Sequence, residues 1–262
     1  MAEPCIPLFQ QLAQAPTTFK PLSLQEYFWP AAKFSLRRLA DVNGKPKIEL
    51  MTFDTKIEAQ FTPSISFPSN TYPDIKRIAS SQVIIVPNPL LMEFALAHGP
   101  SKVLVENLGE YYFKEALDRE SLESEIGILF KLKNTVLGKE NRIPQLYAVV
   151  QDTSDGPILG FLTHFIKGET LPDVMKKLPS ASLKHKWISQ LQKTVDEIHQ
   201  EGIVWGDAKP DNILVDQDDN LVVLDFNGGR TEGWVAAEYM DTMIGDNLAT
   251  AKIKDMILEN SS

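Results

Sequence analysis

The chain has 262 residues, 43% of them hydrophobic, and a formal net charge of −9. That length is enough for one substantial hydrophobic core or for two small lobes. The acidic balance argues against nucleic acid or an anionic membrane as a partner, because either would require a basic face.

Cys5 is the only cysteine. No intramolecular disulfide can therefore form, as is typical of proteins from a reducing compartment. No apolar run approaches the length of a membrane span, and the first residues have neither the basic nor the apolar region of a secretory signal. The sequence predicts a soluble protein of the cytoplasm or nucleus.

Residues 1–80 contain recurrent prolines, and 62–74 are rich in Pro, Ser and Asn. Two β-forming runs, 33–39 and 47–53, flank an Asn-Gly dipeptide at 43–44, which is a hairpin signal. We interpret this region as an accessory segment with a β-hairpin and a linker, which packs on or hangs from the domain after it.

After residue 81 the pattern changes. A strand is expected at 82–86, and a hairpin is expected from 102–106 and 110–116. Lys114 lies in the last of these strands, on the same face as Tyr112. A lysine in a strand is often only a solvated surface residue, so its role depends on the elements that come after it in the chain.

Apolar residues at helical spacing predict a helix over 118–133. It carries two candidate acids, Glu125 and, as the second choice, Glu123. Two further strands are expected within 143–166, and a long amphipathic helix is expected over 182–200.

Four polar residues come after that helix in an order that suits phosphoryl transfer: Asp207, Lys209, Asn212 and, after the β-forming run 221–224, Asp225. Phosphoryl transfer needs a carboxylate to orient the attacking hydroxyl, a cation near the γ-phosphate and oxygen ligands for Mg²⁺. These residues can supply all of those parts.

This set resembles the catalytic loop and metal-binding motif of the protein-kinase-like superfamily, H-R-D-x-K-x-x-N followed by D-F-G. Asp207 and Asp225 lie 18 positions apart, which fits a catalytic loop followed by a two-strand hairpin. Lys209 favours the protein kinases, because the small-molecule kinases of the superfamily commonly carry histidine there. A chance match is the alternative, and the flanking strands argue against it.

The resemblance implies an α+β, two-lobed protein-kinase-like fold over 81–262 that binds Mg-ATP between its lobes. The small antiparallel-sheet lobe would be 81–163, the hinge 164–170, and a shortened helical lobe 171–262. The implied partners are ATP, Mg²⁺ and a hydroxyl acceptor, a serine or threonine of a protein.

In this resemblance Asp207 orients the acceptor hydroxyl and Lys209 neutralises charge on the γ-phosphate. Asn212 and Asp225 hold Mg²⁺, whose preferred ligands are hard oxygens.

The ATP-binding residues are implied in the same way. Lys114, paired with Glu125, holds the α- and β-phosphates. Thr163 stands at the gatekeeper position, and the backbones of His164 and Ile166 face the adenine.

The sequence also departs from the motif. Trp205 and Gly206 stand in place of His and Arg, and 87–101, where a glycine-rich loop is expected, contains only Gly99. The missing arginine normally clamps a phosphorylated activation segment, and Thr231 is the only hydroxyl residue between Asp225 and Glu238. Activity is therefore expected not to depend on phosphorylation there.

Asp246, at the start of a final helix, resembles the acid that braces the catalytic loop through its backbone N–H groups. The sequence at 228–235 resembles fungal kinase-like proteins with a truncated large lobe. The sequence lacks a glycine-rich loop and the further large-lobe helices that dock protein substrates in the family. A pseudokinase scaffold is therefore the alternative function. A small-molecule kinase is the second alternative.

Overall fold

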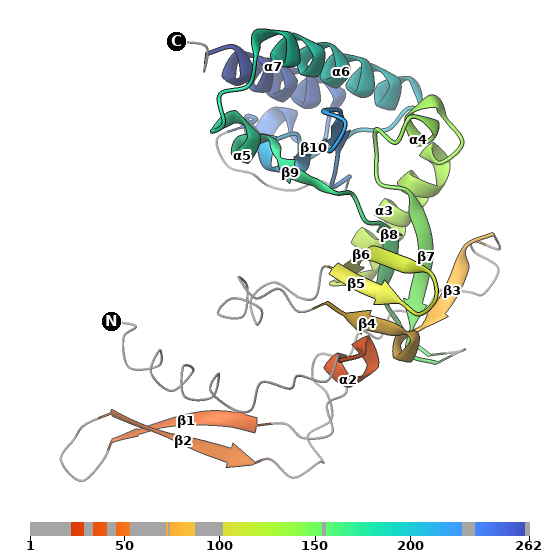
Figure 1. The fold of residues 1–262 in the computed structure, drawn as a ribbon, viewed down its shortest axis with the longest axis vertical. Coiled ribbons are helices and arrows are strands. Elements are labelled where there is room, and N and C mark those ends of the chain that lie inside the picture. Colours follow the sequence, from red (N-terminus) through yellow and green to blue (C-terminus); the bar gives the residue numbers. More distant parts are fainter. Residues whose placement is uncertain are drawn as a thin grey trace.

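The computed structural model has two lobes joined by a short connection, a sheet below and a helical lobe above in Figure 1. The structure describes residues 22–28, 34–40, 46–52, 72, 74–86, 102–153, 156–226 and 234–259, with 34–40 and 46–52 as backbone only. The predictions made for the Asn-Gly turn, for 87–101 and for Thr231 lie outside the described residues.

The small lobe is built on a six-stranded sheet in the order β3-β7-β8-β6-β5-β4. All neighbouring strands are antiparallel except β3 and β7, which are parallel. The strands are β3 (Lys76–Ala79), β4 (Val83–Ile85), β5 (Lys102–Val105), β6 (Gly109–Glu115), β7 (Leu146–Gln151) and β8 (Ile158–His164).

Two features before residue 81 take part in this lobe. Strand β3 is hydrogen-bonded to β7, and the buried Leu24 of α2 (Leu24–Phe28) lies in the core beneath the sheet. The division of the chain into 1–80 and 81–262 stays a prediction. The sheet of the small lobe, however, already begins with β3, before residue 81. Periodicity alone could not show that so short a strand joins a sheet in parallel.

Strands β1 (Phe34–Ala40) and β2 (Pro46–Thr52) form a two-stranded antiparallel sheet where the sequence predicted a hairpin, and the accessory character of this segment stays a prediction. In Figure 1 it lies beside the small lobe, on the side away from the helical lobe.

Helix α3 (Arg119–Leu132) comes after β6 and a short turn. It begins at Asp118, whose carboxylate accepts the Ser121 N–H at 2.8 Å, a cap that satisfies one of the unpaired donors of the first turn. Its buried face carries the apolar residues that the spacing predicted and also the acid Glu125. The short helix α4 (Val136–Lys139) is the next element.

The large lobe contains a three-stranded sheet and three α-helices within the described residues. The sheet has the order β11-β10-β9. The elements are β9 (Gly168–Thr170), α5 (Leu171–Met175), α6 (Ala181–Gln200), β10 (Ile213–Asp216), β11 (Leu221–Val223) and α7 (Met243–Glu259).

The expected hinge is shorter than predicted. Because β9 pairs with β10, residues 168–170 belong to the sheet of the large lobe, and only 165–167 lie between the two sheets. Tertiary pairing decides this, since three residues carry too little pattern to reveal a strand.

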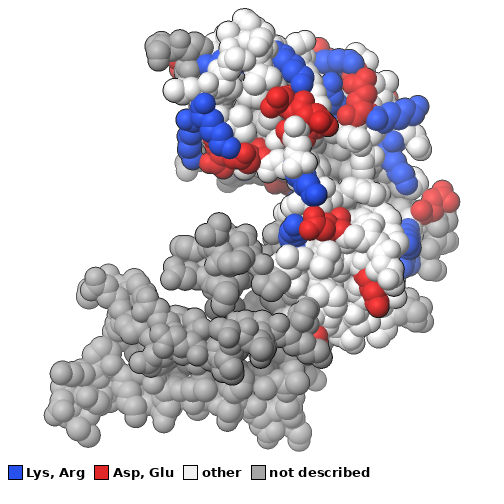
Figure 2. Space-filling view, in the orientation of Figure 1, with Lys and Arg blue, Asp and Glu red and all other residues white. Residues whose placement is uncertain are grey.

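One buried apolar cluster runs through both lobes and includes Leu129 and Phe161 from the small lobe and Trp187 and Trp205 from the large lobe. On the face in Figure 2, acidic and basic side chains are interspersed over the helical lobe. Among the described residues, no helix is long and apolar enough to cross a membrane.

Candidate active site

Lys114 forms the centre of a charged cluster that joins three elements. From β6 its Nζ lies 2.7 Å from Glu125 Oε2 on α3 and 2.5 Å from Asp225 Oδ1, which comes two residues after β11. Glu123, the second choice for this pairing, instead binds Arg119 at 2.8 Å. The structure therefore selects Glu125.

Burial and charge act in opposite directions within this cluster. Burial alone would lower the pKa of Lys114, but Glu125 and Asp225 more than offset it, so the pKa is raised and the lysine is held in its charged form. Burial raises the pKa of the Glu125 carboxyl, and Lys114 opposes that shift. Loss of Lys114 would remove the ion pair of the buried Glu125 carboxylate, whereas loss of Glu125 would leave Lys114 paired with Asp225.

The backbone at Asp225 adopts a left-handed conformation, with φ of 61°. Aspartate tolerates this region better than most residues, at a cost of about 1–3 kcal/mol. Such strained positions cluster at functional sites because the surrounding structure must hold them in place.

The catalytic-loop residues form a second cluster around Asp207, which is 7% exposed. Asp207 Oδ2 accepts from Lys209 Nζ at 2.6 Å and from Asn212 Nδ2 at 2.8 Å. The Asn212 amide also donates to the main-chain oxygen of Asp207 at 2.9 Å. Because the amide nitrogen is used, the amide oxygen of Asn212 is the group left to bind a ligand.

Asp246 fixes this loop from below, as the sequence predicted. It accepts the backbone N–H groups of Trp205 at 2.7 Å and Gly206 at 2.9 Å, and it bonds His199 Nε2 at 2.9 Å. The carboxylate is only 2% exposed, so these bonds replace those that water would make.

Trp205 has a role that sequence reasoning missed. Its indole Nε1 donates to the carbonyl of Leu224 at 2.8 Å and so ties the catalytic loop to the residue before Asp225. The only signal in the sequence is that a ring N–H donor, tryptophan, stands where the motif has histidine.

A cavity of about 430 Å³ lies between the lobes. It brings together seven of the predicted residues: Lys114, Glu125, Thr163, His164, Ile166, Asn212 and Asp225. Tyr112 and Leu214, which sequence reasoning did not assign to the site, also line it.

At the hinge end of this cavity, the N–H of His164 already donates to the carbonyl of Gln145 at 3.0 Å. His164 therefore has no backbone donor left for a ligand. Thr163 is buried and lies opposite Tyr112 in the register of β6 and β8.

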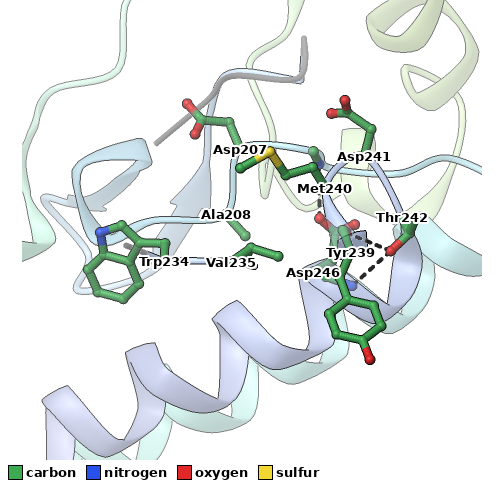
Figure 3. A pocket seen from close by; sticks show the side chains of 11 residues that line it. Asp207, Ala208, Trp234, Val235, Tyr239, Met240, Asp241, Thr242 and Asp246 are labelled. Carbon is green, nitrogen blue, oxygen red and sulfur yellow. Dashed lines mark hydrogen bonds between the residues drawn. The ribbon is translucent and has the colours of Figure 1, made fainter. Parts of the chain in front are cut away.

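Asp207 lines a separate hollow of about 20 Å³ rather than the main cavity. Figure 3 shows Trp234, Val235, Tyr239 and Met240 around it, over the start of α7. The turn that leads into α7 is fixed by the Thr242 hydroxyl, which donates to the carbonyl of Tyr239 at 2.7 Å.

A cavity between two lobes, a lysine–glutamate ion pair and a braced acidic loop are together the features of a protein-kinase-like fold. The family model for the protein kinase domain matches residues 110–246, a little over half of the chain. The chain belongs to the protein kinase domain family.

Three curated relatives cover short stretches of the chain. The cGMP-dependent protein kinase of Plasmodium berghei is 30% identical over 89 residues, 33% of this chain and 10% of that protein. CBL-interacting protein kinase 26 of Oryza sativa subsp. japonica is 28% identical over 115 residues, which are 42% of this chain and 22% of that protein. Serine/threonine-protein kinase PKH3 of Eremothecium gossypii is 29% identical over 143 residues, which are 50% of this chain and 19% of that protein. The chain thus spans less than a quarter of the length of each relative.

Proposed function

We propose that this protein transfers the γ-phosphate of ATP, with Mg²⁺, to the hydroxyl group of a serine or threonine in a protein. The observation that carries the proposal is the cluster of Lys114, Glu125 and Asp225, which shares one cavity with Asn212. The relative from Eremothecium gossypii, by its name a serine/threonine-protein kinase, supports the choice of acceptor.

The main cavity offers binding groups for the nucleotide. Lys114 is charged and held in place by two carboxylates, so it can bind the α- and β-phosphates. The amide oxygen of Asn212 and the second carboxylate oxygen of Asp225 are hard donors of the kind that Mg²⁺ prefers. When bound, the ion would neutralise charge on the phosphate oxygens.

The catalytic loop supplies the groups for the acceptor. Lys209 and Asn212 both hold one carboxylate oxygen of Asp207, which orients the other oxygen to accept a hydrogen bond from the attacking hydroxyl. Lys209, close to that carboxylate, can stabilise charge on the transferring phosphoryl group. The hollow beside Asp207, at about 20 Å³, has room for a group the size of a hydroxyl.

The test is Asp207→Asn, which keeps the shape and removes the charge. Turnover of Mg-ATP with a serine/threonine peptide library should fall about 10²–10⁴-fold, the usual contribution of a positioned base, while ATP affinity changes only a few-fold. Asp218→Asn, an exposed change in the β10–β11 turn, is the matched control and should leave turnover unchanged. ATP binding without turnover in the wild type would favour the scaffold function instead.

A further inference from the structure

Tyr72 lies before the first strand of the small-lobe sheet and packs on helix α3. Its ring centroid lies 5.7 Å from that of Phe130, within the range of a favourable aromatic pair. Its hydroxyl donates to the main-chain carbonyl of Glu123 at 3.5 Å, which is a long hydrogen bond. A Cβ at Gly127 would lie 3.3 Å from the same hydroxyl oxygen, so the phenol rests directly on the backbone of the helix.

These contacts lie on the side of α3 opposite to Glu125. Successive residues of an α-helix are turned by about 100°, so Glu123 and Gly127, two positions before and after Glu125, point about 160° away from it. Glu125 itself faces β6 and its partner Lys114. The helix is therefore held between Lys114 on one side and Tyr72 on the other.

Tyr72 is itself fixed to the sheet. Its carbonyl accepts the N–H of Ile75 at 3.1 Å, and Ile75 belongs to the buried apolar cluster that also contains Leu129 of α3. The next residue, Lys76, begins β3, which is hydrogen-bonded to β7. A side chain anchored in this way opposes movement of α3 away from β6.

We propose that Tyr72 is a positioning residue for phosphoryl transfer, which holds α3 against β6 so that Glu125 stays paired with Lys114. The proposal rests on the proposed function, because this pair matters to the reaction only if Lys114 binds phosphate. Lys114 lies between two carboxylates, and without Glu125 it would be drawn toward Asp225 alone. The position of α3 therefore sets where the ammonium group of Lys114 lies.

A change in the position of α3 has its own signature in nucleotide binding. An apparent affinity falls in proportion to the fraction of molecules in the binding-competent state. In the proposed function Lys114 binds the phosphates and not the nucleoside. Displacement of α3 therefore weakens the binding of ATP but not that of adenosine, whereas general loosening of the small lobe weakens both.

The experiment measures the affinity of the full chain for Mg-ATP and for adenosine. Mg-ATP should bind about 10-fold more weakly to Tyr72→Ala than to the wild type, whereas adenosine should bind equally well to both. Tyr72→Phe should retain the wild-type affinities, because it keeps the ring contact and loses only a long hydrogen bond.

Tyr147→Ala is the matched control. Tyr147 is also a half-buried tyrosine of the small lobe, but it stacks on Tyr111 at 4.4 Å between ring centroids, against a different apolar cluster. Its replacement should leave the affinities for Mg-ATP and adenosine unchanged.

A double-mutant cycle with Glu125→Gln separates positioning from a general effect on stability. Because Tyr72 acts through Glu125, adding Tyr72→Ala to Glu125→Gln should change the affinity for Mg-ATP by less than about 2-fold. Gly127→Leu is a second variant, which favours the helix over glycine and occupies the place of the phenol. It should reproduce the loss of Mg-ATP affinity even if Tyr72→Ala fails to fold.

Three results would overturn the positioning role. They are equal losses for ATP and adenosine, the same loss with and without Glu125, and wild-type affinity for Mg-ATP in folded Tyr72→Ala or Gly127→Leu. Any of these in a protein that binds Mg-ATP would overturn this proposal alone, whereas a wild type that binds no nucleotide would overturn the proposed function as well.

Discussion

Replacement of Asp246 by asparagine tests how the catalytic loop is held. The carboxylate of Asp246 is 2% exposed and uses both oxygens, Oδ1 for the N–H of Gly206 and Oδ2 for the N–H of Trp205 and for His199. An amide has one acceptor oxygen and one NH₂ group. In either orientation its NH₂ group faces a backbone N–H, so at least one buried donor loses its partner.

The size of the effect can be worked out from these bonds. A buried donor without a partner costs about 1–3 kcal/mol, and the bond that remains loses roughly 1 kcal/mol because its acceptor is no longer charged. Asp246→Asn should therefore lower the free energy of unfolding by about 2–4 kcal/mol. Since the bonded N–H groups directly precede Asp207, a displacement of the loop by an ångström could lower turnover by about 10²-fold.

Equilibrium urea denaturation measures the stability, and the turnover assay is run at a temperature where the variant is folded. Asp241→Asn is the matched control, because Asp241 is exposed and its φ of 52° suits asparagine equally well. That change should stay within about 0.5 kcal/mol of the wild type. A loss below about 1 kcal/mol for Asp246→Asn, with an unchanged m-value, would refute the bracing role.

Three further predictions concern the cluster around Lys114. Asp225→Ala should abolish most of the gain in ATP affinity that Mg²⁺ provides. Folding should stay intact because the Asp225 side chain is 41% exposed. An equal effect of Mg²⁺ on the wild type and the variant would contradict the role of Asp225 as a metal ligand. Because burial raises the pKa of Glu125, its ion pair should be lost on acidification at a pH above 4.5, so Mg-ATP affinity should show an inflection there that Glu125→Gln lacks. By the same shift, the Glu125 carboxyl contributes stability below pH 4.5 that is lost as the pH rises through its raised pKa, which denaturation across pH would detect.

Local signals in the sequence were sufficient for most of the elements around the site. Patterns of β-forming residues identified the strands of the small lobe except β3, and helical spacing identified α3 and α6 to within a residue or two. The acids and amide of the catalytic loop could be recognised by resemblance because their spacing along one loop and one hairpin is itself local, and their roles stay predictions. Asp246 was also recognised by resemblance.

Contacts between distant segments required the tertiary structure. Lys114 and Asp225 are 111 positions apart, and nothing in the pattern of either strand specifies the 2.5 Å contact between them. The choice of Glu125 over Glu123 depended on which side of α3 faces β6. The bond from Trp205 to Leu224 depended on how closely the loop approaches β11.

The sequence by itself determined the family resemblance, the order of the elements and the residue types that can handle a phosphate. The tertiary structure alone decided that β3 joins the sheet, that β9 shortens the hinge and that Tyr112 forms part of the cavity roof. The physical reason is that periodicity specifies which face of an element a side chain occupies, whereas the partner of that face is chosen by packing between elements far apart in the chain.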